Sequence, residues 1–257
     1  MADRIIPKLE LRNLAKRFED RVVLDDVDVA VAPGRSLVII GGSGQGKSVT
    51  IKIAAGLMHP DAGQVLYDGE DVTGLPLRGR YALARRYGFL FQGAALFDSL
   101  EIWRNVAFRL INADKVSRKE ARDLAIDALQ KVGLAPSVAD QFPGELSGGM
   151  QKRVGLARAV VAHPEVLFFD EPTTGLDPIN ADVINNLIVE QVKRLGCTAV
   201  SITHDMASAR KIGDEIAMLH AGRIVWRGPA AEIDNSGNPY VEQFINGRAE
   251  GPITSEA

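Results

Sequence analysis

GGSGQGKS, residues 41–48, decides the fold of this chain, because it matches the phosphate-binding pattern G-x-x-x-x-G-K-[ST]. In a chain of 257 residues a chance match has odds of about one in a hundred, given ordinary glycine usage. The apolar run 37–40 before it predicts a buried strand, and apolar residues at helical spacing from Val49 onward predict a helix. We therefore expect a loop that joins a strand to a helix N-terminus, which is the architecture that phosphate binding requires.

Each part of this loop has an expected role. Glycines let backbone N–H groups surround an anion, and the helix N-terminus adds partial positive charge. Lys47 is expected to reach the β- and γ-phosphates, and the Ser48 hydroxyl to ligate Mg²⁺. A turn that merely caps a helix would leave Lys47 and Ser48 unexplained. The residues expected to bind nucleotide here are Gly41, Gly42, Ser43, Gly44, Gln45, Gly46, Lys47, Ser48 and Val49.

A second apolar run, 166–169, predicts a buried strand that ends in two adjacent carboxylates, Asp170 and Glu171. Open α/β sheets place their ligands at the carboxyl ends of strands. Asp170 is expected to hold Mg²⁺ through water, and Glu171 to orient and polarise the water that attacks the γ-phosphate. The alternative is a salt-bridged strand end, which the phosphate loop makes the weaker interpretation.

Four further signals are ambiguous when each is taken alone. Gln92 follows an apolar strand, and either places its amide oxygen on a metal or water or is a surface residue. The stretch LSGGMQ, 146–151, is a Gly-rich loop that precedes a helix, and it is either a second anion site or a structural cap. His204 follows a strand and either contacts a γ-phosphate or is structural. Phe18 either stacks on an adenine or belongs to the core.

Composition limits the partners and the compartment. A formal net charge of −3 gives no global attraction to nucleic acid, so no nucleic acid partner is expected. The single cysteine, Cys197, cannot form an internal disulfide and is expected to be a small core residue. Residues 1–10 lack an apolar stretch of signal-peptide length, and no run approaches the ~20 apolar residues that span a bilayer. Any work at a membrane is therefore expected to go through a partner.

The stretch from about residue 97 has a helical pattern. A capping box from Ser117 to Glu120 predicts a helix that ends at Gly133. Nearer the end of the chain, Ala221-Gly222 joins two short apolar runs as a predicted hairpin. The sequence therefore predicts an α/β protein into which a group of helices is inserted.

The order and combination of these motifs resemble the nucleotide-binding subunit of ATP-binding-cassette (ABC) transporters over nearly the whole chain. The LSGG element is the most specific mark, since other phosphate-loop ATPases lack it. The resemblance implies that Glu171 is the general base, that His204 is the γ-phosphate switch and that Lys47 contributes to catalysis. Met150 departs from the glutamine of most members, so no polar contact is carried over there. The other implied roles are adenine stacking by Phe18, Mg²⁺ binding by Ser48, Gln92 and Asp170, contact with ATP of the opposite subunit by Ser147, Gly148 and Gly149, and a dimer contact by Asp177.

The resemblance also implies a fold and its division. We expect a P-loop NTPase core, which is a mainly parallel sheet flanked by helices with antiparallel β elements at the edge. The expected core is 1–95 and 162–240, and the expected helical subdomain with the signature is 96–161. Residues 241–257 form a C-terminal extension. In it Val241, Phe244 and Ile245 predict one helical turn that Gly247 ends, before a polar strip that is either disordered or ordered.

A narrower resemblance is to the ATPase of Mla-type phospholipid transporters, which maintain outer-membrane lipid asymmetry in Gram-negative bacteria. Phe91–Leu100, Trp103–Phe108 and Gln243–Pro252 carry it, together with LSGGM. It implies a homodimer at the cytoplasmic face of the inner membrane, bound to a permease dimer, an MCE-class lipid-binding protein and a STAS-domain protein. ATP and Mg²⁺ are the implied cofactors. It further implies that the extension embraces the opposite subunit.

Three alternatives remain. The first is an ABC importer of another substrate. The second is an ABC ATPase of DNA repair or chromosome organisation, but those carry long coiled-coil or zinc insertions, whereas this chain has no heptad run and a single cysteine. The third is a module that senses ATP without turnover, which the presence of both Glu171 and His204 disfavours.

Overall fold

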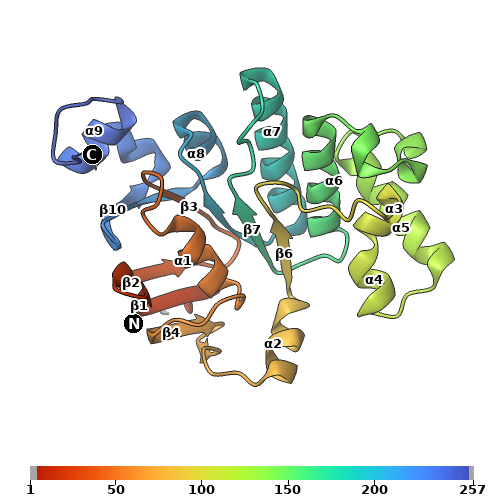
Figure 1. Cartoon of the computed structure of the whole chain (residues 1–257), viewed down its shortest axis with the longest axis horizontal. Helices are drawn as coiled ribbons and strands as arrows, with labels where there is room; N and C mark the ends of the chain where they lie inside the picture. Colours follow the sequence, from red (N-terminus) through yellow and green to blue (C-terminus); the bar gives the residue numbers. More distant parts are fainter. Residues whose placement is uncertain (1–4, 255–257) are drawn as a thin grey trace. The chain divides into compact units, whose positions relative to one another are not determined.

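The chain folds into two compact units. The colours of Figure 1 follow the residue numbers, so the residue ranges of each unit can be found there from the colour bar. The computed structural model describes residues 5–254. The first unit contains residues 5–82 and 198–254, and the second contains 83–197. Helix α2, Leu77–Ala84, includes the point where the chain passes from the first unit to the second. The division between core and helical subdomain expected from the sequence stays a prediction.

The first unit contains two arrangements of strands. One is an antiparallel sheet with the order β2-β1-β4-β5. In the other, β3 pairs in parallel with both β8 and β9, and β10 pairs antiparallel with β9. The bounds are β1 Leu9–Phe18, β2 Arg21–Val31, β3 Ser36–Ile40, β4 Ala62–Tyr67, β5 Glu70–Asp71, β8 Thr198–Ile202, β9 Glu215–His220 and β10 Arg223–Pro229.

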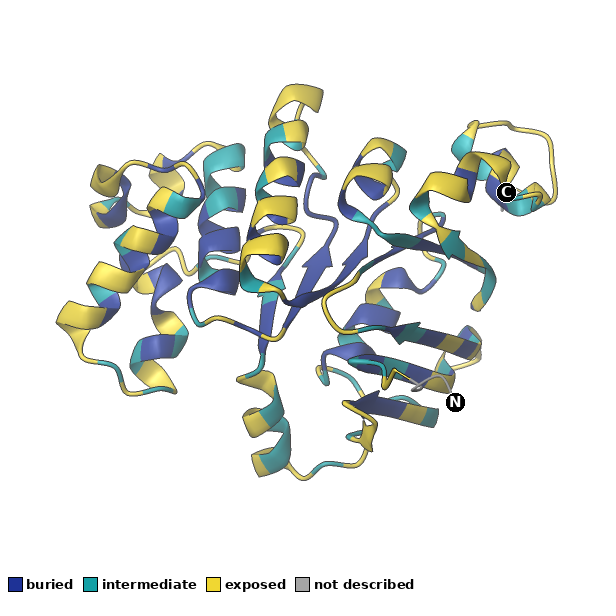
Figure 2. Ribbon diagram, turned by 180° about the vertical axis from the view of Figure 1, so that it is seen from behind, coloured by how far each residue is buried: buried dark blue, intermediate teal, exposed yellow. Residues whose placement is uncertain are grey.

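Burial explains why the parallel strands read as apolar runs. All five residues of β8 are buried, and in β3 all but Ser36 are buried (Figure 2). Strands that are covered on both faces need apolar side chains on both. The covering helices pack close by, α1 on β8 and α8 on β3. The bounds in this unit are α1 Lys47–Ala54, α8 Met206–Ile212, a 3-10 helix Ala230–Asn235 and α9 Pro239–Ile245.

The C-terminal stretch folds back onto α9. Val241 is fully buried, and Gln243 is only 6% exposed. The Gln243 side chain donates to the carbonyl oxygens of Arg248 (3.2 Å) and Ile253 (2.9 Å) and accepts from the backbone N–H of Ile253 (2.7 Å). The predicted helical turn is confirmed, and Gln243 links it by these hydrogen bonds to the described part of the strip that follows. Residues 255–257 lie outside the described residues.

The second unit joins a parallel strand pair to a group of helices, drawn mainly in green in Figure 1. Helix α6 packs on β6 and also on α3, α5 and α7. The approach to β6 is close, because a Cβ at Gly88 would lie 2.2 Å from the Ala159 carbonyl oxygen. The bounds are β6 Tyr87–Leu90, α3 Ile102–Val106, α4 Phe108–Asn112, α5 Arg118–Lys131, α6 Gly148–Val160, β7 Val166–Asp170, α7 Pro178–Leu195 and 3-10 helices at Pro136–Asp140 and Pro143–Glu145.

The α/β class predicted from the sequence is confirmed, as are several of its elements. Ser117 caps α5 by accepting the N–H of Glu120 at 3.3 Å, and Gly133 follows the helix with a φ of 72°. The hairpin of β9 and β10 turns at Ala221 and Gly222. Several elements were not predicted, among them β1, α2, α7 and α8. Strand β1 lacks a regular apolar alternation, and α2 buries none of its residues, so neither shows the periodicity from which elements are predicted.

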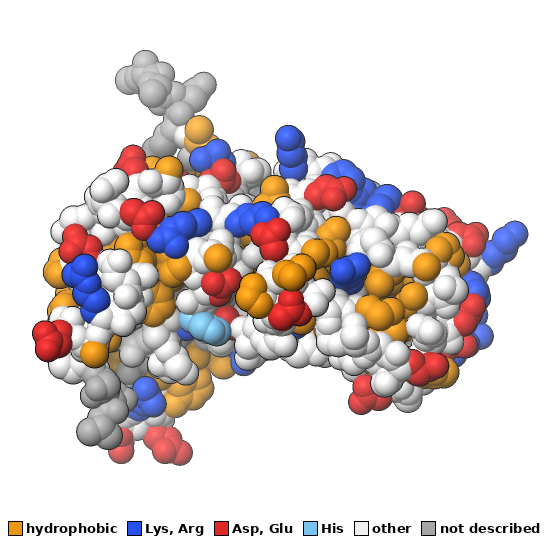
Figure 3. All heavy atoms as spheres, turned by 90° about the horizontal axis from the view of Figure 1, so that it is seen from above, with side chains coloured by type: hydrophobic (Ala, Val, Ile, Leu, Met, Phe, Trp, Pro, Cys, Tyr) orange, Lys and Arg blue, Asp and Glu red, His pale blue; other side chains and the backbone are white. Residues whose placement is uncertain are grey.

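One face of the molecule shows charged side chains of both signs beside exposed hydrophobic ones (Figure 3). On the face drawn in Figure 3, Lys and Arg side chains lie interspersed with Asp and Glu. Mixed charge of this kind produces no extended field of one sign. Within residues 5–254 no helix is both long enough and apolar enough to cross a bilayer.

Candidate nucleotide-binding site

The phosphate loop connects β3 to α1, as the sequence predicts. Gly46 immediately precedes the helix with a φ of 100°, and a Cβ there would lie 2.8 Å from Leu24 Cδ2. Gly41 has a φ of 151°, and its Cβ would lie 2.3 Å from the Leu219 carbonyl oxygen. Both positions therefore require glycine on two counts, the backbone conformation and the lack of space.

Lys47 is held against this loop. Lys47 is only 7% exposed, and its Nζ donates to the carbonyl oxygens of Gly41 (2.7 Å) and Gly42 (2.9 Å). Gln45 ties the loop to the β9–β10 turn, because its Oε1 accepts the N–H of Ala221 at 2.6 Å. The ammonium thus lies beside the loop whose N–H groups are expected to bind phosphate, which is the placement that the predicted role requires.

Two more predicted residues lie in the first unit. Phe18 ends β1 and is 44% exposed, so the alternative that it is a core residue is wrong. Lys16 Nζ lies 5.5 Å from the centre of its ring. His204 is exposed and lies between the end of β8 and α8. Asp205, the next residue, caps α8 by accepting the N–H groups of Ala207 and Ser208, which fixes the backbone at the histidine.

In the second unit the carboxyl end of β7 holds the predicted pair of acids. Asp170 and Glu171 are 7% and 8% exposed. Glu171 has a left-handed backbone with a φ of 48°, which residues with a Cβ seldom adopt. Its Oε2 accepts a hydrogen bond from Thr174 Oγ1 at 3.0 Å, and its carbonyl accepts the N–H of Thr174 at 3.3 Å. The carboxylate is therefore held in a defined orientation.

A buried cation from α6 reaches this strand end. Lys152 is 5% exposed, and its Nζ donates to the carbonyl oxygens of Gln92 and Glu171. Burial lowers the pKa of Lys152, while the charges of Asp170 and Glu171 act to raise it. The ammonium therefore brings the loop after β6, which carries Gln92, together with the end of β7.

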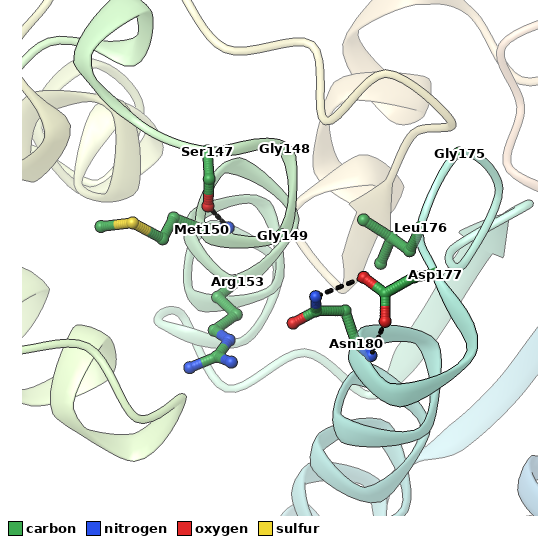
Figure 4. A pocket seen from close by; sticks show the side chains of 9 residues that line it. All are labelled: Ser147, Gly148, Gly149, Met150, Arg153, Gly175, Leu176, Asp177 and Asn180. Carbon is green, nitrogen blue, oxygen red and sulfur yellow. Dashed lines mark hydrogen bonds between the residues drawn. The ribbon is translucent and has the colours of Figure 1, made fainter.

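Two helix N-termini of the second unit line one pocket of about 300 Å³ (Figure 4). Ser147 caps α6 by accepting the N–H of Met150 at 3.4 Å. Asp177 caps α7 by accepting the N–H groups of Ile179 (3.0 Å) and Asn180 (3.1 Å), and Asn180 Nδ2 donates to it at 2.5 Å. These hydrogen bonds lower the pKa of Asp177, the side-chain bond from Asn180 most of all. The structure thus brings together two separate predictions, the signature residues Ser147, Gly148 and Gly149 and the dimer-contact residue Asp177.

Sequence reasoning missed the residues that support this site. Lys152, Arg158, Thr174 and Asn180 hold the backbone or side chains of predicted residues, or of the loop after Gln92. Asn180 lies three residues after Asp177 in the first turn of α7, a spacing that a capping analysis could have detected. No sequence pattern predicts the buried position of Lys152, because a lysine in a helix is usually exposed to solvent.

The donor chemistry of the predicted metal ligands fits Mg²⁺. Ser48, Gln92 and Asp170 offer a hydroxyl, an amide and a carboxylate, and all three are hard oxygen ligands. Residues 5–254 contain no group of three or more His, Cys, Asp or Glu side chains placed to hold a metal ion. Mg²⁺ bound with nucleotides needs only one or two carboxylates, because phosphates and water complete its shell.

Comparisons with known proteins agree with this geometry. The profile of a family described as "ABC transporter" matches residues 24–174. The chain is 38% identical to a probable ribonucleotide transport ATP-binding protein, mkl, of Mycobacterium leprae, over 95% of this chain and 70% of that protein. It is 34% identical to the intermembrane phospholipid transport system ATP-binding protein MlaF of Haemophilus influenzae, over 95% of this chain and 92% of that one. A solved dimeric ATP-binding cassette in a post-hydrolysis state, bound to ADP and Pi, matches with a TM-score of 0.79 and 30% identity, over 86% and 98% of the two chains.

Proposed function

This chain belongs to the ABC transporter family, and we propose that it powers the movement of phospholipid between the inner and outer membranes of a Gram-negative envelope. It is the ATP-binding and ATP-hydrolysing subunit of a transport system. The observation that carries the phospholipid proposal is the similarity to an intermembrane phospholipid transport ATPase over nearly the whole length of both chains.

The proposed cycle uses two copies of the chain. Two subunits close around two ATP molecules, hydrolyse them and reopen, and the movement passes to a membrane permease. In each site the phosphate loop and Lys47 bind the phosphates of one ATP. The pocket at Ser147 and Asp177 contacts the ATP held by the other copy. Support for this arrangement comes from the dimeric cassette to which the chain is similar and from the exposure of that pocket at two helix N-termini.

Hydrolysis is assigned to the end of β7. Glu171 orients the attacking water and accepts its proton. The hydrogen bond from Thr174 Oγ1 holds its carboxylate in one orientation for this role. His204 contacts the γ-phosphate, and Phe18 supplies an exposed ring on which adenine stacks. Ser48, Gln92 and Asp170 would supply oxygen ligands to Mg²⁺, which would neutralise charge on the phosphates.

The proposed partners follow from the phospholipid assignment. They are a second copy of the chain, a permease dimer, an MCE-class lipid-binding protein and a STAS-domain protein. The chain would then lie at the cytoplasmic face of the inner membrane, attached through the permease.

A second candidate function is import of a different solute. The mycobacterial relative is named for ribonucleotide transport, and it matches this chain at a slightly higher identity than the phospholipid relative does. Both candidates share the same ATP chemistry, because substrate choice in such systems is made outside this subunit.

The test is to purify the tagged chain from membranes and identify its partners by mass spectrometry. An MCE-class protein and a permease should be recovered, and the purified complex in lipid vesicles should transfer labelled phospholipid only when ATP is present. Recovery of a solute-binding protein, with ATP-driven uptake of a ribonucleotide and no lipid transfer, would establish the second candidate instead. A complex with Lys47→Ala is the matched control for ATP dependence.

A further inference from the structure

Helix α6 carries two cationic side chains that are turned towards catalytic loops. Lys152, on the second turn of the helix, donates to the carbonyl oxygen of Gln92 and, at 3.3 Å, to that of Glu171. These two residues follow different strands, β6 and β7. One side chain therefore fixes two loops to the helix that Ser147 caps.

The backbone at Glu171 needs such a support. Its φ of 48° is left-handed, a conformation that a residue with a Cβ holds only when its surroundings impose it. The carbonyl oxygen of Glu171 accepts from Thr174 N and from Lys152 Nζ, both at 3.3 Å. Because that peptide sets the direction of the Glu171 side chain, the ammonium also helps to set where the carboxylate points.

Arg158 repeats the arrangement further along the same helix. Its guanidinium donates to the carbonyl oxygens of Ala94 and Ala95, with 2.7 Å to Ala95. Both alanines are left-handed, with φ of 59° and 48°. The loop after Gln92 is thus held at two places by α6, and each contact lies at or beside a strained turn. This repetition argues against a chance contact at Lys152.

We propose that Lys152 is a positioning residue that fixes the Gln92 loop and the Glu171 carboxylate relative to the signature helix α6. Nucleotide contact at the N-terminus of α6 then determines whether Glu171 is aimed for hydrolysis. This inference rests on the role of Glu171 given under the proposed function. Lys152 itself transfers no proton and binds no nucleotide. Its ammonium also offsets the two carboxylates of Asp170 and Glu171, which lie near it.

A merely structural role makes a different prediction. A cation that only fills space in the core would, when replaced, lower stability and disturb ATP binding and turnover together. A positioning residue instead affects the transition state, because the phosphate loop and its Lys47 are unchanged. The two cases are separated by the effects on kcat and on the KM for ATP.

The experiment compares full-length Lys152→Met, Lys152→Arg and Lys193→Met, each in the membrane complex purified with its partners. Lys152→Met should lower the ATPase kcat on the order of 100-fold, because a misplaced catalytic group costs about that factor, and should leave the KM for ATP unchanged. Lys152→Arg keeps the charge and the donors and should recover most of the rate. Lys193, an exposed residue of α7, is the matched control and should give wild-type values. If methionine prevents folding, Lys152→Gln, which keeps a neutral N–H donor, is compared in its place.

Combination with Glu171→Gln gives an independent result. If Lys152 acts through Glu171, the double variant should be no slower than Glu171→Gln alone. The inference is overturned if Lys152→Met turns over normally, if kcat and KM change together without rescue by arginine, or if the double variant loses rate additively. Normal turnover by Glu171→Gln would instead overturn the proposed catalytic role of Glu171, so the two failures can be told apart.

Discussion

At the scale of single residues, Lys47 and Glu171 are charged side chains with separable roles. Lys47→Ala deletes the ammonium that lies on the phosphate loop and should abolish ATP binding. Glu171→Gln keeps the size of the side chain and removes its ability to accept a proton, so binding should persist while hydrolysis falls at least ~100-fold. The measurements are fluorescent ATP-analogue titration and phosphate release. Near-normal turnover by Glu171→Gln would falsify its assignment as the base.

Cys197 supplies a prediction that is independent of the nucleotide site. The thiol is buried, and burial raises its pKa to about 11. At neutral pH it is therefore protonated, and since only the thiolate reacts, alkylation in the folded chain should be on the order of 100-fold slower than in denatured chain, whose thiol has a pKa of about 8.5. The rate should climb with pH until the folded pKa is reached. Intact mass after timed iodoacetamide treatment measures this, and rapid labelling of folded protein at pH 7 would contradict the burial.

At the scale of elements, the sequence predicts best where a local signal is complete. The cap at Ser117 and the stop at Gly133 bound α5, and β7 contains the uninterrupted apolar run 166–169 between polar residues. The phosphate loop was predicted in full because its glycines, its lysine and its flanking strand and helix all lie within one short stretch. Local signals of this kind are independent of the rest of the fold.

Other features of the site depend on contacts between distant stretches. The link from Lys152 to Gln92 joins residues far apart in sequence, and so does the link from Arg158 to Ala94. No spacing rule connects such residues. The left-handed backbone of Glu171 cannot be predicted from the sequence either. A glutamate at this position indicates acid chemistry, but it does not indicate a positive φ. Sequence patterns therefore supply the reacting groups but not what holds them.

The cap of α6 is the element on which the composite site depends. Ser147→Arg should leave ATP binding by one subunit intact and block hydrolysis, because the arginine enters the pocket that under the proposed function contacts the other copy's ATP. Mixing tests this proposal. A Ser147→Arg subunit combined with a Lys47→Ala subunit should recover activity above either homodimer, since one complete site can form.

Ser117→Arg is the matched control for that substitution. It removes an equivalent cap from α5 and should cost about 1 kcal/mol of stability without blocking hydrolysis. Equal loss of ATPase activity in both variants would mean that helix capping, and not contact with nucleotide, explains the effect. A mixture with no recovered activity would count against a site shared between two copies.

At the scale of the whole molecule, the predicted site residues are divided between the two units. Phe18, the phosphate loop and His204 belong to the first unit, whereas Gln92, Glu171 and the pocket at Ser147 belong to the second. Under the proposed function, hydrolysis also needs the pocket at Ser147 of a second copy.

The C-terminal stretch gives the last prediction. Its described part is fastened to α9 through Gln243, whose hydrogen bonds reach Arg248 and Ile253 and not the phosphate loop. Truncation after Gly247 should therefore leave the ATP affinity of a single subunit unchanged. The resemblance to Mla-type ATPases implies an extension that embraces the opposite subunit, and on that hypothesis truncation should weaken dimer assembly and lower ATPase activity at low protein concentration. Gln243→Ala keeps the extension and removes its hydrogen bonds to α9. If those hydrogen bonds compete with contact to the opposite subunit, this variant should assemble at least as well as the wild type.

ATPase rate per subunit is measured against protein concentration for all three chains. A truncated chain that follows the wild-type curve at every concentration would show that the extension takes no part in assembly.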